Sequence, residues 1–162
     1  MYLLDTNICI YAMNGRHPTL TEHLLSVSPD RIFISSVTVG ELEYGAAKSH
    51  WGDKARERMH AFLANFTILP FTEDDALLFG RFRAQLAASG TPIGAYDVMI
   101  AAQGVARNLI VVTHNIDEFS RIPDIRLEDW AKEQNSYNSR NESVRTVPTD
   151  FCIRTLMTAL SN

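Results

Sequence analysis

The sequence contains only two cysteines, Cys9 and Cys152, and they lie far apart along the chain. Two distant cysteines provide neither the disulfide framework of a small secreted domain nor the closely spaced pairs of a structural zinc site. We therefore expect both thiols to be reduced, with Cys9 as a small residue of the core.

Long hydrophobic runs are also missing. No apolar segment approaches the roughly 20 residues that a helix needs to cross a bilayer. The N-terminal segment MYLLDTNICIY carries an acid where a signal peptide would carry Lys or Arg. These two absences predict a cytoplasmic protein with no membrane association.

The sequence has less positive than negative charge: it contains 15 Lys and Arg and 19 Asp and Glu, which gives a net charge of −4. This balance argues against a protein that holds nucleic acid by broad electrostatic attraction, because Lys and Arg drive phosphate binding. It does not exclude a nuclease, because acids that converge on a divalent cation reverse the local charge where a phosphate binds.

Short apolar segments alternate with amphipathic ones over most of the chain. We predict strands at residues 2–4, 32–34, 66–69, 109–112 and 125–127. We predict helices at residues 6–13, 20–27, 37–48, 51–64, 73–88 and 95–106. This alternation implies parallel pairing through right-handed crossovers, hence an α/β fold with four to five parallel strands between layers of helices. The strand at 109–112 is the richest in β-branched residues and is expected to be central.

The composition changes near residue 133. Residues 134–145 are rich in Asn, Ser, Arg and Glu, which is typical of a linker. A helix-start signal at Pro148 precedes apolar residues at helical spacing from Phe151 to Leu160. We therefore divide the chain into a main domain at 1–133 and an appendage at 134–162, a polar linker with an amphipathic C-terminal helix. Whether that helix docks on protein or lacks a fixed structure stays open.

Three acids stand where predicted strands and helices meet. Asp5 follows the first strand, Glu41 lies about a turn and a half into the helix after the second, and Asp97 lies in the first turn of the helix before the fourth. Ligands of open parallel sheets bind beyond the carboxyl ends of the strands, so we expect these carboxylates to converge within reach of one cation. Because Mg²⁺ and Mn²⁺ prefer hard oxygen ligands, the pattern predicts one of these metals.

Two of these acids, Asp5 and Asp97, also have an ordinary structural explanation. Asp5 is well suited to cap the helix that follows it, although capping does not exclude metal binding. Asp97 precedes the apolar run 98–102, where an ionised side chain is costly unless it is paired or bound to metal. The helix dipole offsets only part of that cost. Asp97 is therefore the acid that a structural role explains least well.

Four segments, in this order, resemble the motifs of a known family. They are LLDTN at 3–7, SSVTVGELEYG at 35–45, GTPIGAYDVMIAA at 90–102 and VVTHNIDEF at 111–119. Together with IPDIRLEDW at 122–130, they are similar to the VapC-type toxins, the PIN-domain members of bacterial type II toxin–antitoxin pairs. Four motifs in the right order are far more specific than any one of them.

The resemblance implies a PIN-like three-layer sandwich over residues 1–133, in which Asp5, Glu41 and Asp97 correspond to the metal-binding acids of the family. Many PIN domains have a further Asp after the fourth strand, where this sequence has Asn115. The last metal ligand therefore stays open between Asn115, through its carbonyl or a water, and Asp117.

Two threonines are candidates for supporting hydroxyl groups, Thr6 beside Asp5 and Thr113 after the fourth strand. They would orient the metal-binding carboxylates by hydrogen bonds. Capping or strand-end hydrogen bonding explains these residues at least as well.

The resemblance also implies an activity and partners. It implies an endoribonuclease dependent on Mg²⁺ or Mn²⁺ that acts as a toxin and cleaves single-stranded loops of structured RNA such as tRNA. It further implies a homodimer and a cognate antitoxin protein that inhibits the enzyme.

Two other functions fit parts of the sequence. A phosphatase of the haloacid dehalogenase type also begins with a strand that ends in Asp, but it uses a second Asp as general acid where this sequence has Asn7, which cannot supply the proton. A catalytically silent binding module would use the acids only to hold a partner, and Asn115 in place of Asp is consistent with it. Metal-dependent cutting of RNA by the purified protein would exclude the silent module.

Overall fold

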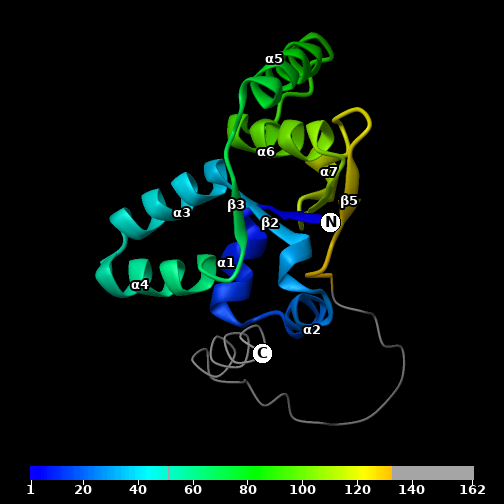
Figure 1. Ribbon diagram of the computed structural model, residues 1–162. Helices are drawn as coiled ribbons and strands as arrows, with labels where there is room; N and C mark the ends of the chain where they lie inside the picture. Colours follow the sequence, from blue (N-terminus) through cyan, green and yellow to red (C-terminus); the bar gives the residue numbers. More distant parts are fainter. Residues whose placement is uncertain (51, 133–162) are drawn as a thin grey trace, which may run out of the picture.

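Five short parallel strands form the centre of the computed structural model, which describes residues 1–50 and 52–132 (Figure 1). The strands are β1 (Tyr2–Leu4), β2 (Ile32–Ser35), β3 (Thr67–Leu69), β4 (Ile110–Val112) and β5 (Arg126–Glu128). Their order is β3-β2-β1-β4-β5, and all neighbours pair in parallel. The predicted parallel α/β sheet is confirmed, with β1 rather than β4 in the middle; β4 is an interior strand between β1 and β5.

Helices connect the strands at nearly the predicted positions. They are α1 (Thr6–Asn14), α2 (Pro18–Ser26), α3 (Ser36–Lys48), α4 (Gly52–Leu63), α5 (Glu73–Ala88), α6 (Ala95–Ala106) and α7 (Ile116–Phe119), and a 3₁₀ turn, η1, covers Pro29–Arg31. The helix α2 begins two residues earlier than predicted because proline is favoured in the first turn of a helix. The helix α7 was not predicted, since four residues are too few to show a helical period.

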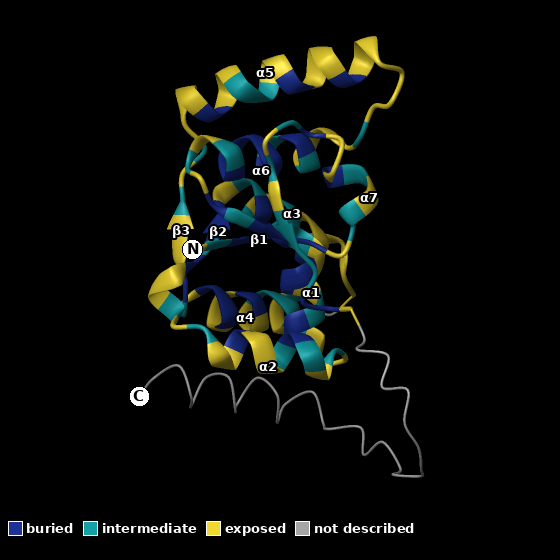
Figure 2. Ribbon diagram, turned by 90° about the vertical axis from the view of Figure 1, so that its right-hand side faces the viewer, coloured by how far each residue is buried: buried dark blue, intermediate teal, exposed yellow. Residues whose placement is uncertain are grey.

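The helices cover both faces of the sheet (Figure 2). Leu4 and Ile34 belong to one buried cluster together with residues of α1, α2 and α4. Leu3 and Val111 belong to a second cluster, with residues of α5 and α6. Successive strand residues point to opposite faces of a sheet, so the adjacent Leu3 and Leu4 serve different layers. The three-layer sandwich is confirmed.

The helix α6 lies close against the sheet. A Cβ atom at Gly104 would collide with the side chain of Val111 on β4, so only glycine permits this approach. At the other end of α6, Asp97 stands in the first turn. The packing at Gly104 therefore helps to set the position of Asp97 relative to the sheet.

Some sequence predictions fall outside the described residues. These are the polar linker and C-terminal helix at 134–162, Cys152, and Trp51 at the start of the predicted fourth helix. Cys9 is buried and unpaired, as expected. Of the helices in the described part of the chain, none has the length and apolar character needed to cross a membrane.

Candidate functional site

Asp5 stands directly after β1 and caps α1. Its side chain is buried, and both carboxylate oxygens accept hydrogen bonds. The Thr6 N–H donates to Oδ1 at 2.6 Å, and the Thr113 hydroxyl donates to Oδ2 at 3.0 Å. The predicted cap is therefore present, and Thr113, which directly follows β4, fixes the second oxygen.

Glu41 is linked to the same edge of the sheet through Thr6. The Thr6 hydroxyl donates to Glu41 Oε2 at 2.5 Å, and it lies 3.4 Å from the hydroxyl of Thr38. Thr6 thus contacts Glu41 on α3 through its hydroxyl and Asp5 through its backbone N–H. Both threonines predicted as supporting residues contact predicted site acids.

Asp97 lies in the first turn of α6, close to the backbone of Gly94, which caps this helix. A Cβ atom at Gly94 would stand 3.1 Å from Asp97 Oδ2, so a larger residue there would crowd the carboxylate. Among the described residues, none donates a hydrogen bond or forms an ion pair with the Asp97 carboxylate. The Asp97 carboxylate oxygens therefore have no hydrogen-bond donor or cationic partner among the described residues.

The three acids share one electrostatic environment. The pKa of Asp5 is raised to about 6, chiefly by burial and also by the charge of Glu41, while hydrogen bonds from Thr113 and Thr6 act to lower it. The pKa of Asp97 is likewise raised to about 6, chiefly by burial and also by the charges of Asp5, Glu41 and Glu118. Within residues 1–50 and 52–132, no Lys, Arg or His forms an ion pair with these acids. The site is therefore a cluster of negative charge suited to a cation.

Glu118 is a further acid beside Asp97 that the sequence did not single out. It is partly buried on α7 and raises the pKa of Asp97, whereas Asp117 is exposed and is not among the charges that act on Asp97. Asn115 precedes α7, and its backbone N–H donates to the Thr113 hydroxyl at 3.0 Å. Neighbouring helical residues point about 100° apart, so only the assignment of a helix at 116–119 could have separated Asp117 from Glu118.

The side chains as they stand do not enclose a metal ion. In the described ranges, no three His, Cys, Asp or Glu side chains are close enough to form a metal site. The charge of Glu41 raises the pKa of Asp5, and the charges of Asp5 and Glu41 raise the pKa of Asp97, so the three acids are neighbours. Their direct coordination of a single cation stays a prediction.

In metal-free buffer, the protein is expected to be more stable near pH 5 than near pH 7. The pKa values of Asp5 and Asp97 are raised from 3.8 to about 6, so over this range the folded state binds more protons than the unfolded state. Their contribution to stability is full below about pH 4 and is lost as the pH rises through about 6. Mn²⁺ should oppose this loss, because cations bind the ionised carboxylates.

Thermal denaturation in EDTA and in Mn²⁺, across this pH range, measures the effect. Asp97→Asn, which removes one of the two raised carboxyl groups, should show a weaker pH trend in EDTA. Identical pH trends for the wild type and this variant would contradict the assignment of Asp97 to the charge cluster.

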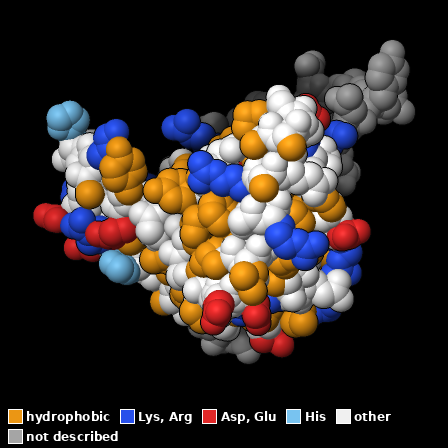
Figure 3. All heavy atoms as spheres, turned by 90° about the horizontal axis from the view of Figure 1, so that it is seen from above, with side chains coloured by type: hydrophobic (Ala, Val, Ile, Leu, Met, Phe, Trp, Pro, Cys, Tyr) orange, Lys and Arg blue, Asp and Glu red, His pale blue; other side chains and the backbone are white. Residues whose placement is uncertain are grey.

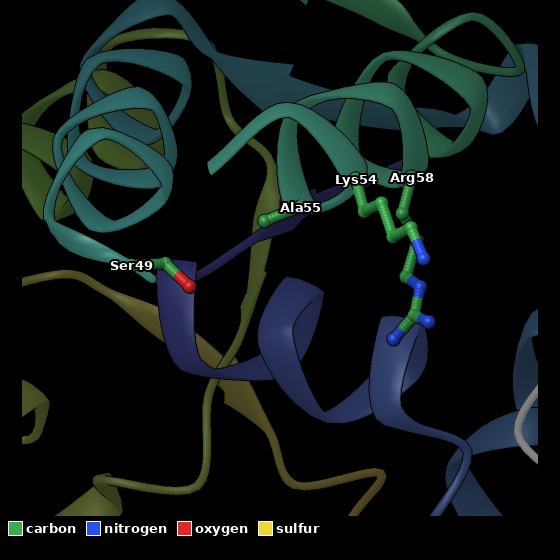
Figure 4. Close-up of a pocket in the computed structure, with 4 residues that line it drawn as sticks. All are labelled: Ser49, Lys54, Ala55 and Arg58. Carbon is green, nitrogen blue, oxygen red and sulfur yellow. The ribbon is translucent and has the colours of Figure 1, made fainter. Parts of the chain in front are cut away.

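A second feature is a cleft at the turn between α3 and α4, lined by Ser49, Lys54, Ala55 and Arg58 (Figure 4). Lys54 and Arg58 extend in the same direction from successive turns of α4. The cleft contains none of the site acids, so it is a separate, basic feature. On the face seen from above, Lys and Arg are scattered among hydrophobic and acidic side chains (Figure 3).

Comparison with known proteins gives one consistent family. A family model described as PIN domain matches residues 2–125. The tRNA(fMet)-specific endonuclease VapC of Salmonella typhimurium is 40% identical over 129 residues, which are 80% of this chain and 97% of that protein. Ribonuclease VapC2 of Rickettsia felis is 38% identical over 133 residues, 82% of this chain and 99% of that protein.

Solved structures show the same relationship. The DNA-bound VapBC of Salmonella typhimurium aligns with a TM-score of 0.75 and 40% identity, over 80% of this chain and 97% of that one. VapBC2 of Rickettsia felis, bound to a promoter DNA fragment, aligns with a TM-score of 0.72 and 36% identity, over 80% of this chain and 98% of that one.

Proposed function

Because this chain belongs to the PIN-domain family as a toxin ribonuclease of the VapC type, we propose that Asp5, Glu41, Asp97 and Glu118 hold Mg²⁺ or Mn²⁺ where RNA is cleaved. The observation that carries the proposal is the cluster of acids from separate segments with no cationic side chain paired to it. Carboxylates that are buried together without a counter-charge are costly, and a divalent cation removes that cost.

The residues present fit such a cation. Carboxylate oxygens are the hard ligands that Mg²⁺ and Mn²⁺ prefer. When bound, a divalent cation supplies Lewis-acid activation of water and offsets the charge that develops on the phosphate. The protein's own contribution is orientation: hydrogen bonds from Thr6 and Thr113 hold Asp5, and the Thr6 hydroxyl holds Glu41. Carboxylates that are already oriented need less reorganisation when ligand binds.

The substrate that we propose is a single-stranded loop of structured RNA, with tRNA as the first candidate. Relatives from Salmonella typhimurium and Shigella flexneri are named tRNA(fMet)-specific endonucleases. Unstacked bases in loops leave the backbone accessible to an active site, whereas paired bases in an A-form helix do not.

The protein partner is a cognate antitoxin. The structural neighbours include VapBC-5 of Mycobacterium tuberculosis, described as a member of a family of toxin–antitoxin systems, which is 29% identical with a TM-score of 0.57. We further propose a two-fold homodimer that buries apolar helix surface, with α1 and α3 as the candidate helices. Sedimentation at micromolar concentration checks this oligomeric state, and a fully active monomer would contradict it.

Purified, antitoxin-free protein is expected to cut total RNA in Mn²⁺ or Mg²⁺ and not in EDTA. Sequencing of the new 5′ ends, after brief expression in a host that lacks the antitoxin, should place the cuts in single-stranded loops. Cutting that persists in EDTA would remove the metal from the mechanism. A sample that binds the metal but cuts no RNA would favour the silent binding module.

A further inference from the structure

The exposed face of α3 continues beyond Glu41. Tyr44 and Lys48 follow Glu41 by three and seven residues, so helical geometry places all three on one side of α3. The buried residues Thr38, Leu42 and Ala46 form the other side. Along the helix axis, Tyr44 lies about 5 Å and Lys48 about 10 Å beyond Glu41. A ligand that reaches Glu41 along this face would pass both side chains.

The Tyr44 ring is presented to the outside. Tyr44 is 65% exposed, the highest fraction among the exposed large hydrophobic residues of the described chain. The Lys48 ammonium lies 5.0 Å from the centre of the ring. This places a flat aromatic surface and a positive charge together, next to a site that is otherwise negative.

Two glycines within α3 keep this face open. A Cβ atom at Gly40 or at Gly45 would meet nothing within 4 Å, so packing within the described chain does not require either glycine. Glycine inside a helix costs about 1 kcal/mol relative to alanine. Close approach of a ligand backbone to the helix would explain why glycine occupies these positions despite its cost to helix stability.

The chemistry of this face matches a nucleotide strand. Aromatic rings bind single-stranded RNA by stacking on bases, independently of sequence, and Lys contacts the phosphates. A second copy of this chain is the rival occupant, because α3 is also a candidate for the homodimer interface. Lys48 beside the ring favours the polyanion, since burial of an ammonium in an apolar interface without a counter-charge is costly.

We propose that Tyr44 and Lys48 form an RNA-contact site on α3, in which a base next to the scissile phosphodiester stacks on the Tyr44 ring while Lys48 contacts the adjoining phosphate. The proposal rests on the ribonuclease function proposed above and adds the residues that hold the strand beside the acids.

Fluorescence anisotropy with a short labelled single-stranded RNA tests the contact, with Ca²⁺ in place of Mn²⁺ so that binding is measured apart from cleavage. Tyr44→Ala should weaken binding about tenfold, whereas Tyr44→Phe should bind like the wild type. Lys48→Gln should lower the slope of log affinity against log salt by about 0.7, the share of one phosphate on a single strand. Leu77→Ala, at an exposed position on α5, is the control and should change neither quantity.

Two further measurements make the outcome decisive. Mn²⁺ affinity, measured by calorimetry, should be the same in Tyr44→Ala and the wild type, and both should sediment alike. Unchanged RNA affinity in Tyr44→Ala, or a loss that coincides with dissociation into monomers, would overturn the contact site. Failure of the proposed function gives a different pattern, in which RNA binding still depends on Tyr44 but no cleavage occurs in Mn²⁺.

Discussion

Replacement of Asp97 by Asn is expected to lower the rate of RNA cleavage by more than about a hundredfold. The change keeps the size of the side chain and removes one negative charge from the cluster of Asp5, Glu41 and Glu118. Since no described residue donates a hydrogen bond to the Asp97 carboxylate, the variant loses no structural contact within that part of the chain. It should therefore fold, and in EDTA it should melt at a higher temperature than the wild type because repulsion is relieved.

The same variant should lose the stabilisation that Mn²⁺ gives to the wild type, because only a cation bound to the folded state raises the melting temperature. Asp124→Asn is the matched control: Asp124 is exposed, lies before the amino end of β5, and has a positive φ that Asn tolerates. Cleavage of RNA by Asp97→Asn at the wild-type rate would show that this acid is not part of the active site.

Two acids on α7, Asp117 and Glu118, are candidates for a further metal ligand. Assays of Glu118→Gln and Asp117→Asn in parallel separate them. We expect Glu118→Gln to lose more RNA cleavage than Asp117→Asn.

Replacement of Asp75 by Ala is expected to destabilise the protein by about 3 kcal/mol, which lowers the melting temperature by on the order of 10 °C. Asp75 is 1% exposed in the first turn of α5. Its Oδ2 accepts hydrogen bonds from the Thr72 N–H at 2.7 Å, the Thr72 hydroxyl at 2.9 Å and Arg107 Nη2 at 2.9 Å. Burial acts to raise the pKa of Asp75, but these bonds hold it below 3.8, so the ionised form stabilises the fold at neutral pH.

This ion pair also holds the helix that carries Asp97. Arg107 follows the end of α6, and its Nη2 also donates to the Pro70 carbonyl at 2.8 Å. Buried Gln103, in the last turn of α6, donates to the same carbonyl at 3.0 Å. Asp75→Ala would leave Arg107, which is 28% exposed, without its counter-charge. We therefore expect Asp75→Ala to weaken the packing of α6 as well as the start of α5.

Asp74→Ala is the control, because Asp74 is exposed in the same turn of α5 and only its interaction with the helix dipole is lost. Urea denaturation of the two variants gives the comparison. Equal unfolding free energies for Asp74→Ala and Asp75→Ala would contradict the role of the buried pair. Acidification should reduce the advantage of the wild type over Asp75→Ala, since protonation of Asp75 removes the same interaction.

The sequence predicted most of the fold because the local patterns were strong. Apolar strands such as 2–4 and 109–112, with amphipathic helices between them, defined the parallel α/β sheet to within a few residues. The helix over Ile116–Phe119 was not predicted, because a single turn is too short to show a helical period. The middle position of β1 was also missed, since strand order depends on crossovers that propensity does not describe.

The sequence also singled out three of the four acids that we propose for the candidate site, and their role stays a prediction. Asp5 stood out because it follows a buried strand, and Asp97 because it precedes an apolar helix. Glu118 did not stand out, because its role depends on which way one residue of a short helix points. Asp75 did not either: in sequence it is one of three consecutive acids at a helix start, and only the approach of Arg107 from another helix distinguishes it from Asp74.

By itself, the sequence determined the alternation of strands and helices, and it placed Asp5, Glu41 and Asp97 at the junctions of those elements. These properties are local, because periodicity, capping and the cost of an acid beside apolar residues act over a few neighbouring positions. Only the tertiary structure decided which acids influence one another, that Thr6 and Thr113 orient them, and that the buried partner of Asp75 is Arg107. Those contacts join residues from about 30 to more than 100 positions apart, and chain packing alone sets the distances and burial on which their energies depend.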